Sequence, residues 1–353
     1  MLTPAWFDGV MLFILLFTLF IATTQEKIPN THWIFTALVA VIAIVQLGFA
    51  PITEEVGTDR LNYSYMFSHA DELTNYGFRD IGFAYYTQLC HFLTGTDVGG
   101  FVITAIIYVG AYIYFCRKAN PDRHLYFILL CFLSLGFTNH SYNVLRAGLC
   151  IAILLIAISK EQNKYVTLLL FITAVSCHIV ALLLILGYIF TKYITDTRIW
   201  FCLWVVMALA LFMGFFDSFE QWGNAMMSLE DDRFERYLLG SSINYETGLR
   251  IDFIAYSLFP IIIGGYYTYI KKYKDVFYRH LYNTYIFCNA CWLIVSKMPF
   301  NDRFAYFSWF LIPFILLYPI LDNSANNIKS KKLIFVLCIS VVVGLNIYLK
   351  YLR

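Results

Sequence analysis

Charged side chains are scarce in this chain of 353 residues: Asp, Glu, Lys and Arg make up 14% of it, whereas hydrophobic residues make up 60%. An ordinary soluble domain has roughly 25% charged and 45 to 50% apolar residues, so this composition excludes a soluble globular protein. The net charge of +2 and the lack of a basic stripe interleaved with aromatic residues exclude a nucleic-acid-binding protein. The mean hydropathy of +0.66 instead predicts an all-α, polytopic integral membrane helical bundle.

A removable signal peptide is also missing. The first apolar segment, residues 6–24, has neither a basic start nor an evident cleavage site, so we expect it to remain as the first membrane span. The cysteines lie in or beside apolar segments, which excludes a disulfide framework in the outer loops. Cys288 and Cys291 have the CxxC spacing of metal sites, but they lie inside an apolar segment without a second pair, so we interpret them as core residues.

Apolar segments long enough to cross a membrane recur along the whole chain. A span requires roughly 20 apolar residues, and we predict spans at 6–24, 33–50, 98–115, 125–137, 144–159, 199–216, 253–269, 281–296, 304–320 and 333–349. Residues 165–190 are interrupted near His178 and are interpreted as two short helices, and residues 81–93 as an interfacial or re-entrant helix. With no internal repeat, the sequence predicts one transmembrane domain over residues 1–353, with about 12 membrane helices, some short or re-entrant.

Lysine and arginine fall on opposite sides of the membrane in the topology that this pattern favours. Both termini then lie outside, although Lys350 and Arg353 argue against an outer C-terminus, and residues 51–97 and 217–252 form two outer, periplasmic segments. Every lysine except Lys297 and Lys350 lies on the inner side, as the positive-inside rule requires, but most arginines lie outside. Because a guanidinium forks onto phosphate oxygens, the outer arginines predict recognition of a phosphorylated ligand there.

Ionisable residues at membrane depth are costly and therefore informative: Arg146, His178, Lys297, Asp302 and Arg303. Arg146 follows the polar run 139–143, which predicts a water-filled cavity; the alternative is an arginine that extends to the interface. An imidazole with an ordinary pKa of about 6.5 can accept a proton at neutral pH, so His178 is either a base or a structural hydrogen-bonding group. For Arg303, ligand binding and an ion pair with Asp302 are equally favoured.

The two outer segments are where we expect the chemistry to lie. They carry these further charged residues: Glu54, Glu55, Asp59, Arg233, Arg236, Arg250 and Asp252. The run Glu230-Asp231-Asp232 has the ligand type of a divalent-cation site. Carboxylate runs in loops are usually only solvated, however, so no metal is predicted.

These residues also give the chain a resemblance to a known family. It is similar to the EpsG-like, Wzy-type polymerases of bacterial O-antigen and exopolysaccharide through short motifs spread over most of its length. The motifs are Gly57-Thr58-Asp59 with Tyr63 and Tyr65, Asp80-Ile81-Gly82-Phe83, Arg146 opening a helix, His178 in a broken span, Arg236-Tyr237, and Arg303 with Tyr306-Phe307. The chain departs from the family pattern at Ala147, Val180 and Ile81, where the family often has Gln, Ser and Pro, and it has no arginine shortly before Gly57.

The resemblance implies a GT-C-like polymerase architecture in the bacterial inner membrane, with the active site facing the periplasm. Such an enzyme is a metal-independent glycosyltransferase without a cofactor, and it polymerises undecaprenyl-pyrophosphate-linked oligosaccharide repeat units into O-antigen or exopolysaccharide. The partners that the resemblance implies are the lipid-linked glycan donor and acceptor, membrane lipid and a chain-length regulator protein, with no nucleic acid.

The implied chemistry gives each candidate residue a role. The pyrophosphate leaving group gains charge as the glycosidic bond breaks, and preorganised arginines stabilise that charge best where water is excluded. We predict that four arginines bind the pyrophosphate: Arg146, Arg236, Arg303 and, as a weaker member, Arg250. Because pyrophosphate leaves without a general acid, the remaining need is a base for the acceptor hydroxyl, for which the candidates are His178, which is favoured, and Asp59.

Other classes of membrane protein share some of these features. An O-antigen ligase has the same donor and arginine chemistry but transfers the glycan to lipid A core. A non-enzymatic flippase or transporter of lipid-linked oligosaccharide is expected to place charged residues through both leaflets, often on repeated halves. A membrane acyltransferase requires a catalytic histidine with access from inside, where no comparable cluster lies. The polymerase is favoured, and the ligase and the flippase or transporter remain the alternatives.

Overall fold

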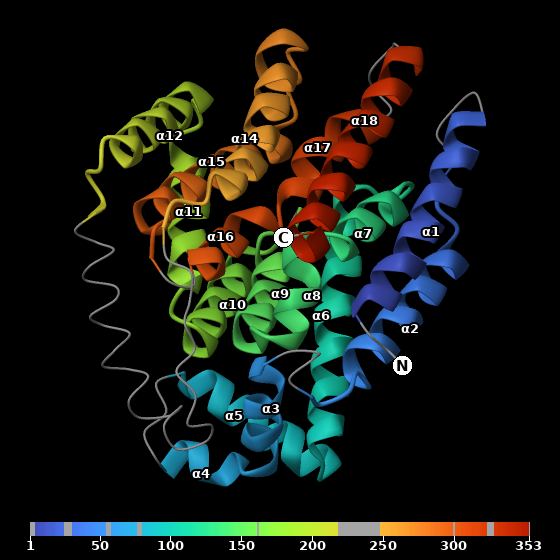
Figure 1. The fold of residues 1–353 in the computed structure, drawn as a ribbon, viewed down its shortest axis with the longest axis vertical. Helices are drawn as coiled ribbons and strands as arrows, with labels where there is room; N and C mark the ends of the chain where they lie inside the picture. The colour runs from blue at the N-terminus through green and yellow to red at the C-terminus, as the bar shows by residue number, and fades with distance from the viewer. Residues whose placement is uncertain are drawn as a thin grey trace. The chain divides into compact units, whose positions relative to one another are not determined.

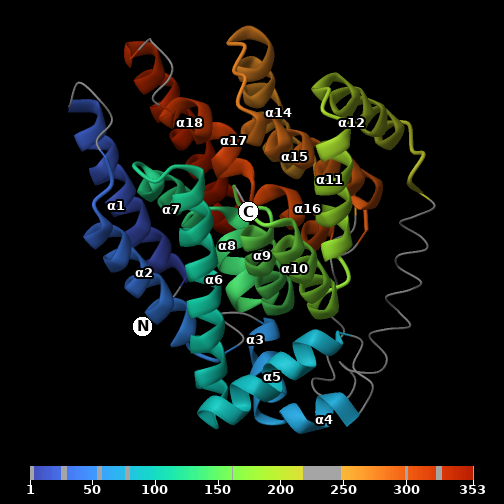
Figure 2. The same ribbon diagram turned by 180° about the vertical axis from the view of Figure 1, so that it is seen from behind.

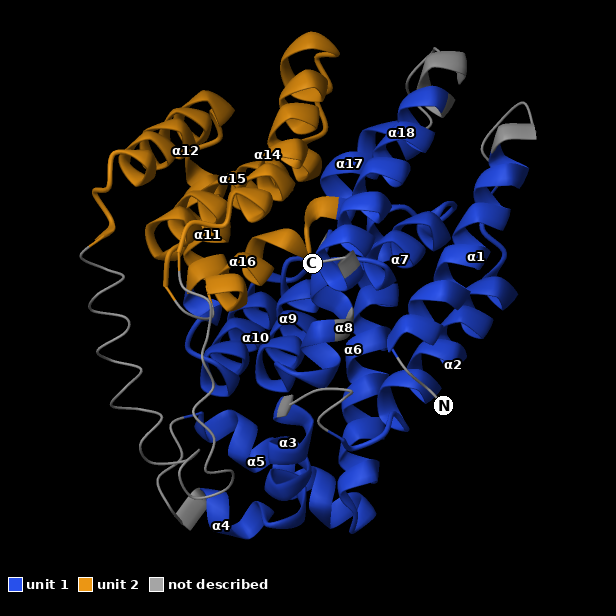
Figure 3. Ribbon diagram, viewed as in Figure 1, with its two compact units in different colours: residues 1–182, 313–353 blue, residues 183–312 orange. Residues whose placement is uncertain are grey.

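A computed structural model describes residues 4–24, 30–53, 58–75, 80–160, 162–217, 248–298, 301–322 and 328–352 (Figure 1). Within these residues every regular element is a helix, which confirms the predicted all-α class. The chain divides into two compact units (Figure 3). Unit 1 comprises Met1–Leu182 and Pro313–Arg353, and unit 2 comprises Leu183–Ile312.

Unit 1 holds the first ten helices and the last two. They are α1 (Pro4–Thr24), α2 (Trp33–Gly48), α3 (Thr58–Ser68), α4 (Ala70–Asn75), α5 (Ile81–Thr94), α6 (Asp97–Ala119), α7 (His124–Phe132), α8 (Leu135–Tyr142), α9 (Leu145–Ala157), α10 (Lys164–Cys177), α17 (Ile312–Leu321), α18 (Ile328–Ile347) and the π-helical turn η2 (Tyr348–Leu352). The long helix α6 is the centre of the packing, since α2, α3, α5, α7 and α9 all contact it. Helices α3, α4 and α5 lie together beside the first turns of α6 (Figure 2).

Unit 2 is built from α11 (Ala181–Tyr193), α12 (Thr197–Phe212), α14 (Ile251–Gly265), η1 (Tyr266–Ile270), α15 (Val276–Val295) and α16 (Asn301–Trp309). A buried polar network joins three of these helices. Trp204 Nε1 donates to Asn289 Oδ1 at 2.8 Å, and Asn289 Nδ2 donates to Ser308 Oγ at 3.2 Å. Because buried polar groups are costly unless they are hydrogen-bonded, this network fixes how α12, α15 and α16 pack.

Five helices are long and apolar enough to cross a membrane: Pro4–Ala22, Asp97–Ala119, Ile251–Ile270, Asn301–Leu321 and Leu333–Tyr351. A sixth candidate is the bent pair α7 and α8, and five shorter apolar helices accompany them in the described part of the chain. The protein is therefore a multi-pass membrane protein. The expected total of about 12 membrane helices stays a prediction, because the shorter helices are not long enough to count by themselves.

The predicted span 125–137 is not one straight helix. Helix α7 ends at Phe132, and α8 begins at Leu135 after a bend of 62°. The polar run 139–143 belongs mostly to α8, where His140 and Ser141 are buried, and that the run lines a water-filled cavity stays a prediction. Tyr108 of α6 donates to the Phe137 carbonyl, and its hydroxyl lies 3.3 Å from His140 Nδ1. The cavity beside His140 and Ser141 measures only about 10 Å³, roughly the space of one water molecule.

A buried arginine holds α3 in place. Arg60 is fully buried, and its Nη2 donates to the carbonyls of Leu47, Gly48 and Ala50. The first two residues end α2, and the third follows it. Its guanidinium also stacks 3.9 Å from the ring centre of Phe101 on α6. The carbonyls at the end of a helix carry partial negative charge, so they stabilise a cation that water no longer reaches. Arg60 thereby fixes α3 against α2 and α6.

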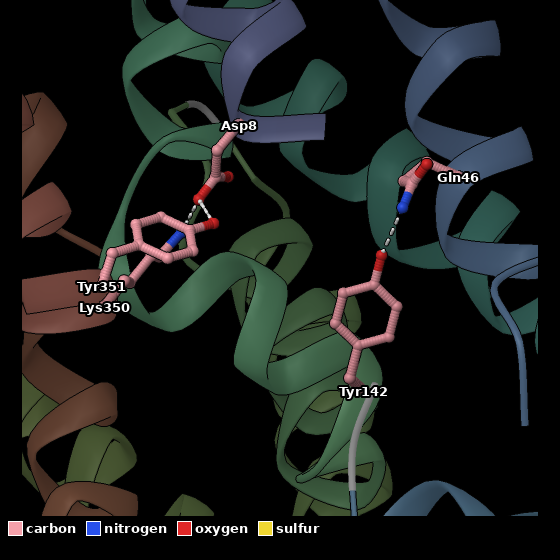
Figure 4. A network of polar contacts seen from close by, with 5 residues as sticks. All are labelled: Asp8, Gln46, Tyr142, Lys350 and Tyr351. Atoms are coloured by element: carbon pink, nitrogen blue, oxygen red, sulfur yellow. Dashed lines mark hydrogen bonds and ion pairs between the residues drawn. The ribbon is translucent and has the colours of Figure 1, made fainter. Parts of the chain in front are cut away.

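The two ends of the chain meet inside unit 1. Lys350 Nζ donates to Asp8 Oδ2 at 2.9 Å, and the Tyr351 hydroxyl donates to the same oxygen at 2.7 Å (Figure 4). Gln46 Nε2 likewise donates to the Tyr142 hydroxyl at 3.1 Å and joins α2 to α8. The start of α1 and the end of η2 therefore lie together, which agrees with both termini on one side of the membrane. That both termini lie on the outer side stays a prediction.

Candidate functional site

Asp80 lies between two of the predicted site residues. Arg146 Nη1 donates to Asp80 Oδ2 at 2.7 Å, and His178 Nδ1 lies 3.5 Å from the same oxygen. Asp80 is only 5% exposed, whereas the Arg146 side chain is 31% exposed and that of His178 is 18% exposed. Three segments that are distant in the sequence thus bring one carboxylate, one guanidinium and one imidazole together. We call these three residues the Asp80 cluster.

Local structure explains why the Asp80 carboxylate is available to the cluster. Asp80 is the N-cap residue of α5, a position where aspartate usually accepts a hydrogen bond from the first turn of its own helix. Here the side chain makes no such capping bond. Its backbone carbonyl accepts from Ala84 N instead, at 3.1 Å. The carboxylate consequently serves Arg146 and His178 rather than its own helix.

Gly82 allows α5 to approach α10 closely. A Cβ atom at Gly82 would lie 2.8 Å from the backbone carbon of Ser176 and would also collide with the Ser176 side chain. Such contacts essentially never occur, so only glycine permits this approach. Ser176 precedes His178 by two residues. The close packing therefore places the N-terminus of α5 beside the end of α10.

The broken apolar segment has the predicted form. Helix α10 ends at Cys177, α11 begins at Ala181, and His178 between them has an extended backbone (φ −163°, ψ 120°). The predicted helix break at His178 is thus confirmed. The imidazole projects from this break rather than from a regular helical turn, which lets it reach Asp80.

Arg146 is held from two sides. It lies in the first turn of α9, and besides Asp80 it interacts with the Tyr63 side chain of α3. Tyr63 is 5% exposed and packs edge-on against Phe83 of α5, with ring centres 5.9 Å apart. The position of α3, fixed by Arg60, therefore also helps to orient the Arg146 guanidinium.

The electrostatics favour an ionised Asp80. Burial by itself raises the pKa of the Asp80 carboxyl, but the nearby His178 and Arg146 side chains outweigh this effect, so the pKa lies below its ordinary value. Asp80 is a carboxylate at neutral pH and balances the Arg146 charge.

The other predicted site residues lie elsewhere in the chain. Asp59 is in the first turn of α3, in unit 1. Arg250 and Arg303 belong to unit 2, and Arg236 lies outside the described residues, as do Glu54, Glu55 and the run 230–232. The structure thus brings together Arg146 and His178 through Asp80. That Arg236, Arg250 and Arg303 join them stays a prediction.

Within unit 2, acidic side chains accompany the arginines. Both oxygens of Asp252 accept hydrogen bonds from Arg250, at 3.0 and 2.9 Å, and the guanidinium lies over the Phe253 ring. Asp302, expected as an alternative partner of Arg303, accepts a hydrogen bond from the Tyr306 hydroxyl at 2.9 Å. Arg250 is therefore held by a forked ion pair, and its role in binding pyrophosphate stays a prediction.

Sequence reasoning did not single out Asp80 or Tyr63 as site residues. Both occurred only as members of short motifs that resemble the EpsG-like polymerases. An aspartate immediately before an apolar segment is typical of a helix N-cap, so nothing in the sequence alone distinguishes a capping carboxylate from one that contacts distant side chains.

Comparison with known proteins identifies the family of the chain. No curated protein and no solved structure matches the sequence. The EpsG family matches residues 32–352, which include all three members of the Asp80 cluster. Because this match covers nearly the whole sequence, the chain belongs to the EpsG family, whose members are polymerase-like membrane proteins of exopolysaccharide and O-antigen synthesis.

Proposed function

We propose that the protein is a polysaccharide polymerase that transfers a glycan from undecaprenyl pyrophosphate to the terminal sugar of a lipid-linked repeat unit. The observation that supports this most strongly is the Asp80 cluster, in which a guanidinium and an imidazole flank one buried carboxylate. The guanidinium suits a diphosphate, and the imidazole suits an acceptor hydroxyl. A GT-C-like bundle of about 12 membrane helices in the inner membrane, with a periplasmic site and a chain-length regulator as partner, completes the proposal.

The proposed reaction needs two kinds of assistance. The bond between the anomeric carbon of the donor and the diphosphate oxygen breaks, so the leaving diphosphate gains negative charge, which Arg146 stabilises. Arg236 and Arg303, with Arg250 as a weaker contributor, share this task in the proposal. The acceptor oxygen forms the new bond to the anomeric carbon and gives up its proton to a base. Since arginines carry the leaving-group charge, the proposed reaction is independent of a metal.

His178 is the favoured base because Asp80 can orient it. With Nδ1 facing the Asp80 carboxylate, Nε2 is the ring nitrogen directed to the acceptor hydroxyl. A carboxylate in this position also stabilises the imidazolium that forms after proton transfer, as it does in other catalytic histidine–carboxylate pairs. Asp80 is therefore a positioning residue in the proposal, whereas Arg146 and His178 contact the reacting groups. Asp59 remains the second candidate base.

Reconstitution separates the polymerase from its alternatives. The purified full-length chain is placed in lipid nanodiscs with undecaprenyl-pyrophosphate-linked repeat units as the sole substrate, and the products are resolved by length. A polymerase produces a ladder of longer lipid-linked glycans. A ligase, which requires lipid A core as acceptor, and a flippase or transporter both leave the repeat units unchanged. Unchanged repeat units in a well-folded preparation would overturn the proposal.

A further inference from the structure

Helix α5 carries a continuous exposed apolar stripe. Ile81, Tyr85, Leu89 and Phe92 follow one another at helical spacing and are 60%, 62%, 54% and 85% exposed. Residues three and four positions apart lie on one face of a helix, so these side chains form one row. We call this row the α5 stripe. It extends from Ile81 to Phe92, a rise of about 16 Å at 1.5 Å per residue.

The opposite face of α5 is part of the core of unit 1. Phe83, Ala84 and Cys90 belong to a buried cluster that also includes Phe67 of α3 and Phe101 of α6. Helix α5 therefore packs with one face only. Its sequence also contains Thr87, Gln88 and His91, and it is neither one of the candidate membrane spans nor one of the shorter apolar helices. The sequence predicts an interfacial or re-entrant helix here, and such a helix turns its exposed aromatic and aliphatic side chains toward lipid tails.

The α5 stripe begins beside the Asp80 cluster. Ile81 directly follows Asp80, and Asp80 contacts both Arg146 and His178. Gly82 packs against Ser176, so the N-terminal end of α5 is anchored next to the polar groups. The polar groups of the Asp80 cluster and the apolar α5 stripe thus adjoin each other at the N-terminal end of α5. A ligand with a charged head group and a long apolar tail would match this arrangement.

We propose that the α5 stripe binds the isoprenoid tail of the lipid-linked substrate while Arg146 binds its diphosphate. This inference rests on the proposed function and adds the path of the tail. The first isoprene units then run from Asp80 toward Phe92, where they pass into the bilayer. Burying a large apolar side chain against such a tail contributes roughly 1.5 kcal/mol or more, which corresponds to about a tenfold change in binding.

Photocrosslinking tests the path directly. Benzoylphenylalanine is introduced at Tyr85 or Phe92 and, as a control, at Phe13 or Phe20 of the spanning helix α1, whose side chains are 72% and 66% exposed. The probe is a fluorescent undecaprenyl-pyrophosphate-linked oligosaccharide in phosphatidylethanolamine and phosphatidylglycerol nanodiscs. We expect crosslinks at Tyr85 and Phe92 at least tenfold above those at Phe13 and Phe20. Equal labelling at all four positions would show that α5 contacts only bulk lipid and would overturn the inference.

Kinetics provide the second test. Leu89→Ser and Phe92→Ser each remove an exposed apolar side chain from the α5 stripe without touching the Asp80 cluster. Each variant should raise the apparent KM for the lipid-linked substrate about tenfold and leave kcat within twofold, whereas Phe13→Ser should change neither. Unchanged KM values in both stripe variants would overturn the inference.

The two proposals fail in different ways. An Arg146→Lys variant that polymerises normally contradicts the proposed function. An inactive Arg146→Lys variant combined with uniform crosslinking contradicts only the path of the tail.

Discussion

Two acid–base clusters among the described residues of unit 1 differ in how far their side chains are exposed. Near the ends of the chain, one oxygen of Asp8 accepts hydrogen bonds from Lys350 and from Tyr351. The side chains of Asp8 and Lys350 are each 11% exposed. In the Asp80 cluster, one buried carboxylate faces a guanidinium and an imidazole that are both more exposed than it is. One cluster is a compact pair with balanced charge. In the other cluster, both partners of the carboxylate are more exposed than the carboxylate itself.

The chemistry of the two cations accounts for the difference. The ammonium of Lys350 is a point charge with three donors, whereas the guanidinium of Arg146 has five donors in a planar fork. Arg146 Nη1 donates to one oxygen of Asp80, and the planar fork is the geometry that the proposed function uses to bind a diphosphate. An ion pair at membrane depth is therefore not by itself a sign of a site. In the proposed function, the identity of the cation and the exposure of its side chain distinguish the Asp80 cluster from the pair of Asp8 and Lys350.

The largest expected effect comes from exchanging the two types of cation. Arg146→Lys should reduce the rate of polymerisation about a thousandfold, because loss of one transition-state donor typically costs that much and an ammonium cannot fork onto two phosphate oxygens. Lys350→Arg should retain activity within a few fold, since the cavity of about 250 Å³ beside Lys350 has room for the larger side chain. The measurement is glycan chain growth by both variants at matched protein levels. Equal losses in both would remove the distinction between the clusters.

The second prediction concerns stability at the chain ends. Asp8→Asn leaves the largely buried ammonium of Lys350 without its counter-charge, which should lower the free energy of unfolding by about 3 kcal/mol. Adding Lys350→Met should restore most of that loss, because the unpaired charge is then gone. Melting temperatures in detergent measure both effects. A double variant that melts no higher than Asp8→Asn would show that the ion pair itself, rather than the unpaired charge, stabilises this region.

The third prediction separates the two candidate bases. His178→Gln should slow polymerisation about a hundredfold, the lower part of the range for general-base catalysis, while leaving the binding of the lipid-linked donor intact. Asp59→Asn should retain most of the wild-type rate. Single-turnover measurements with saturating substrate distinguish the chemical step from binding. The reverse pattern would assign proton transfer to Asp59 and make His178 a structural partner of Asp80.

Much of the fold was predictable because it depends on the length of apolar runs. Residues 6–24 and 98–115 form helices close to the predicted bounds, and the polar residues near His178 correctly indicated a break. The bend after Phe132 was missed, because Ser134 is the only polar residue of 125–137 and a single serine is tolerated within an apolar helix. The contact between Tyr108 of α6 and His140 of α8 depends on tertiary structure, which the local sequence does not encode.

The candidate site was predictable only in part, for a related reason. Arg146 and His178 stood out because ionisable groups are rare at membrane depth. Asp80 did not, since its position before α5 has an ordinary local explanation as a helix cap. That its side chain makes no capping bond is a property of the packing between α5, α9 and α10, which no local pattern encodes.

The smallest predicted effect is on the pH dependence of stability, and it tests whether Asp80 is ionised in the folded protein. Because its pKa is lowered in the fold, the carboxylate stabilises the protein fully above its ordinary value of 3.8, and this contribution is lost as the pH falls through the folded value. The melting temperatures of the wild-type protein and of Asp80→Asn are compared, because the lowered pKa depends on the His178 and Arg146 side chains, which both proteins retain. We expect a constant difference between pH 7 and about 5, and a decreasing one below 3.8. A difference that stays constant through the acid range would mean that Asp80 is not stabilised as an anion, and Arg146 would then lack the partner that orients it.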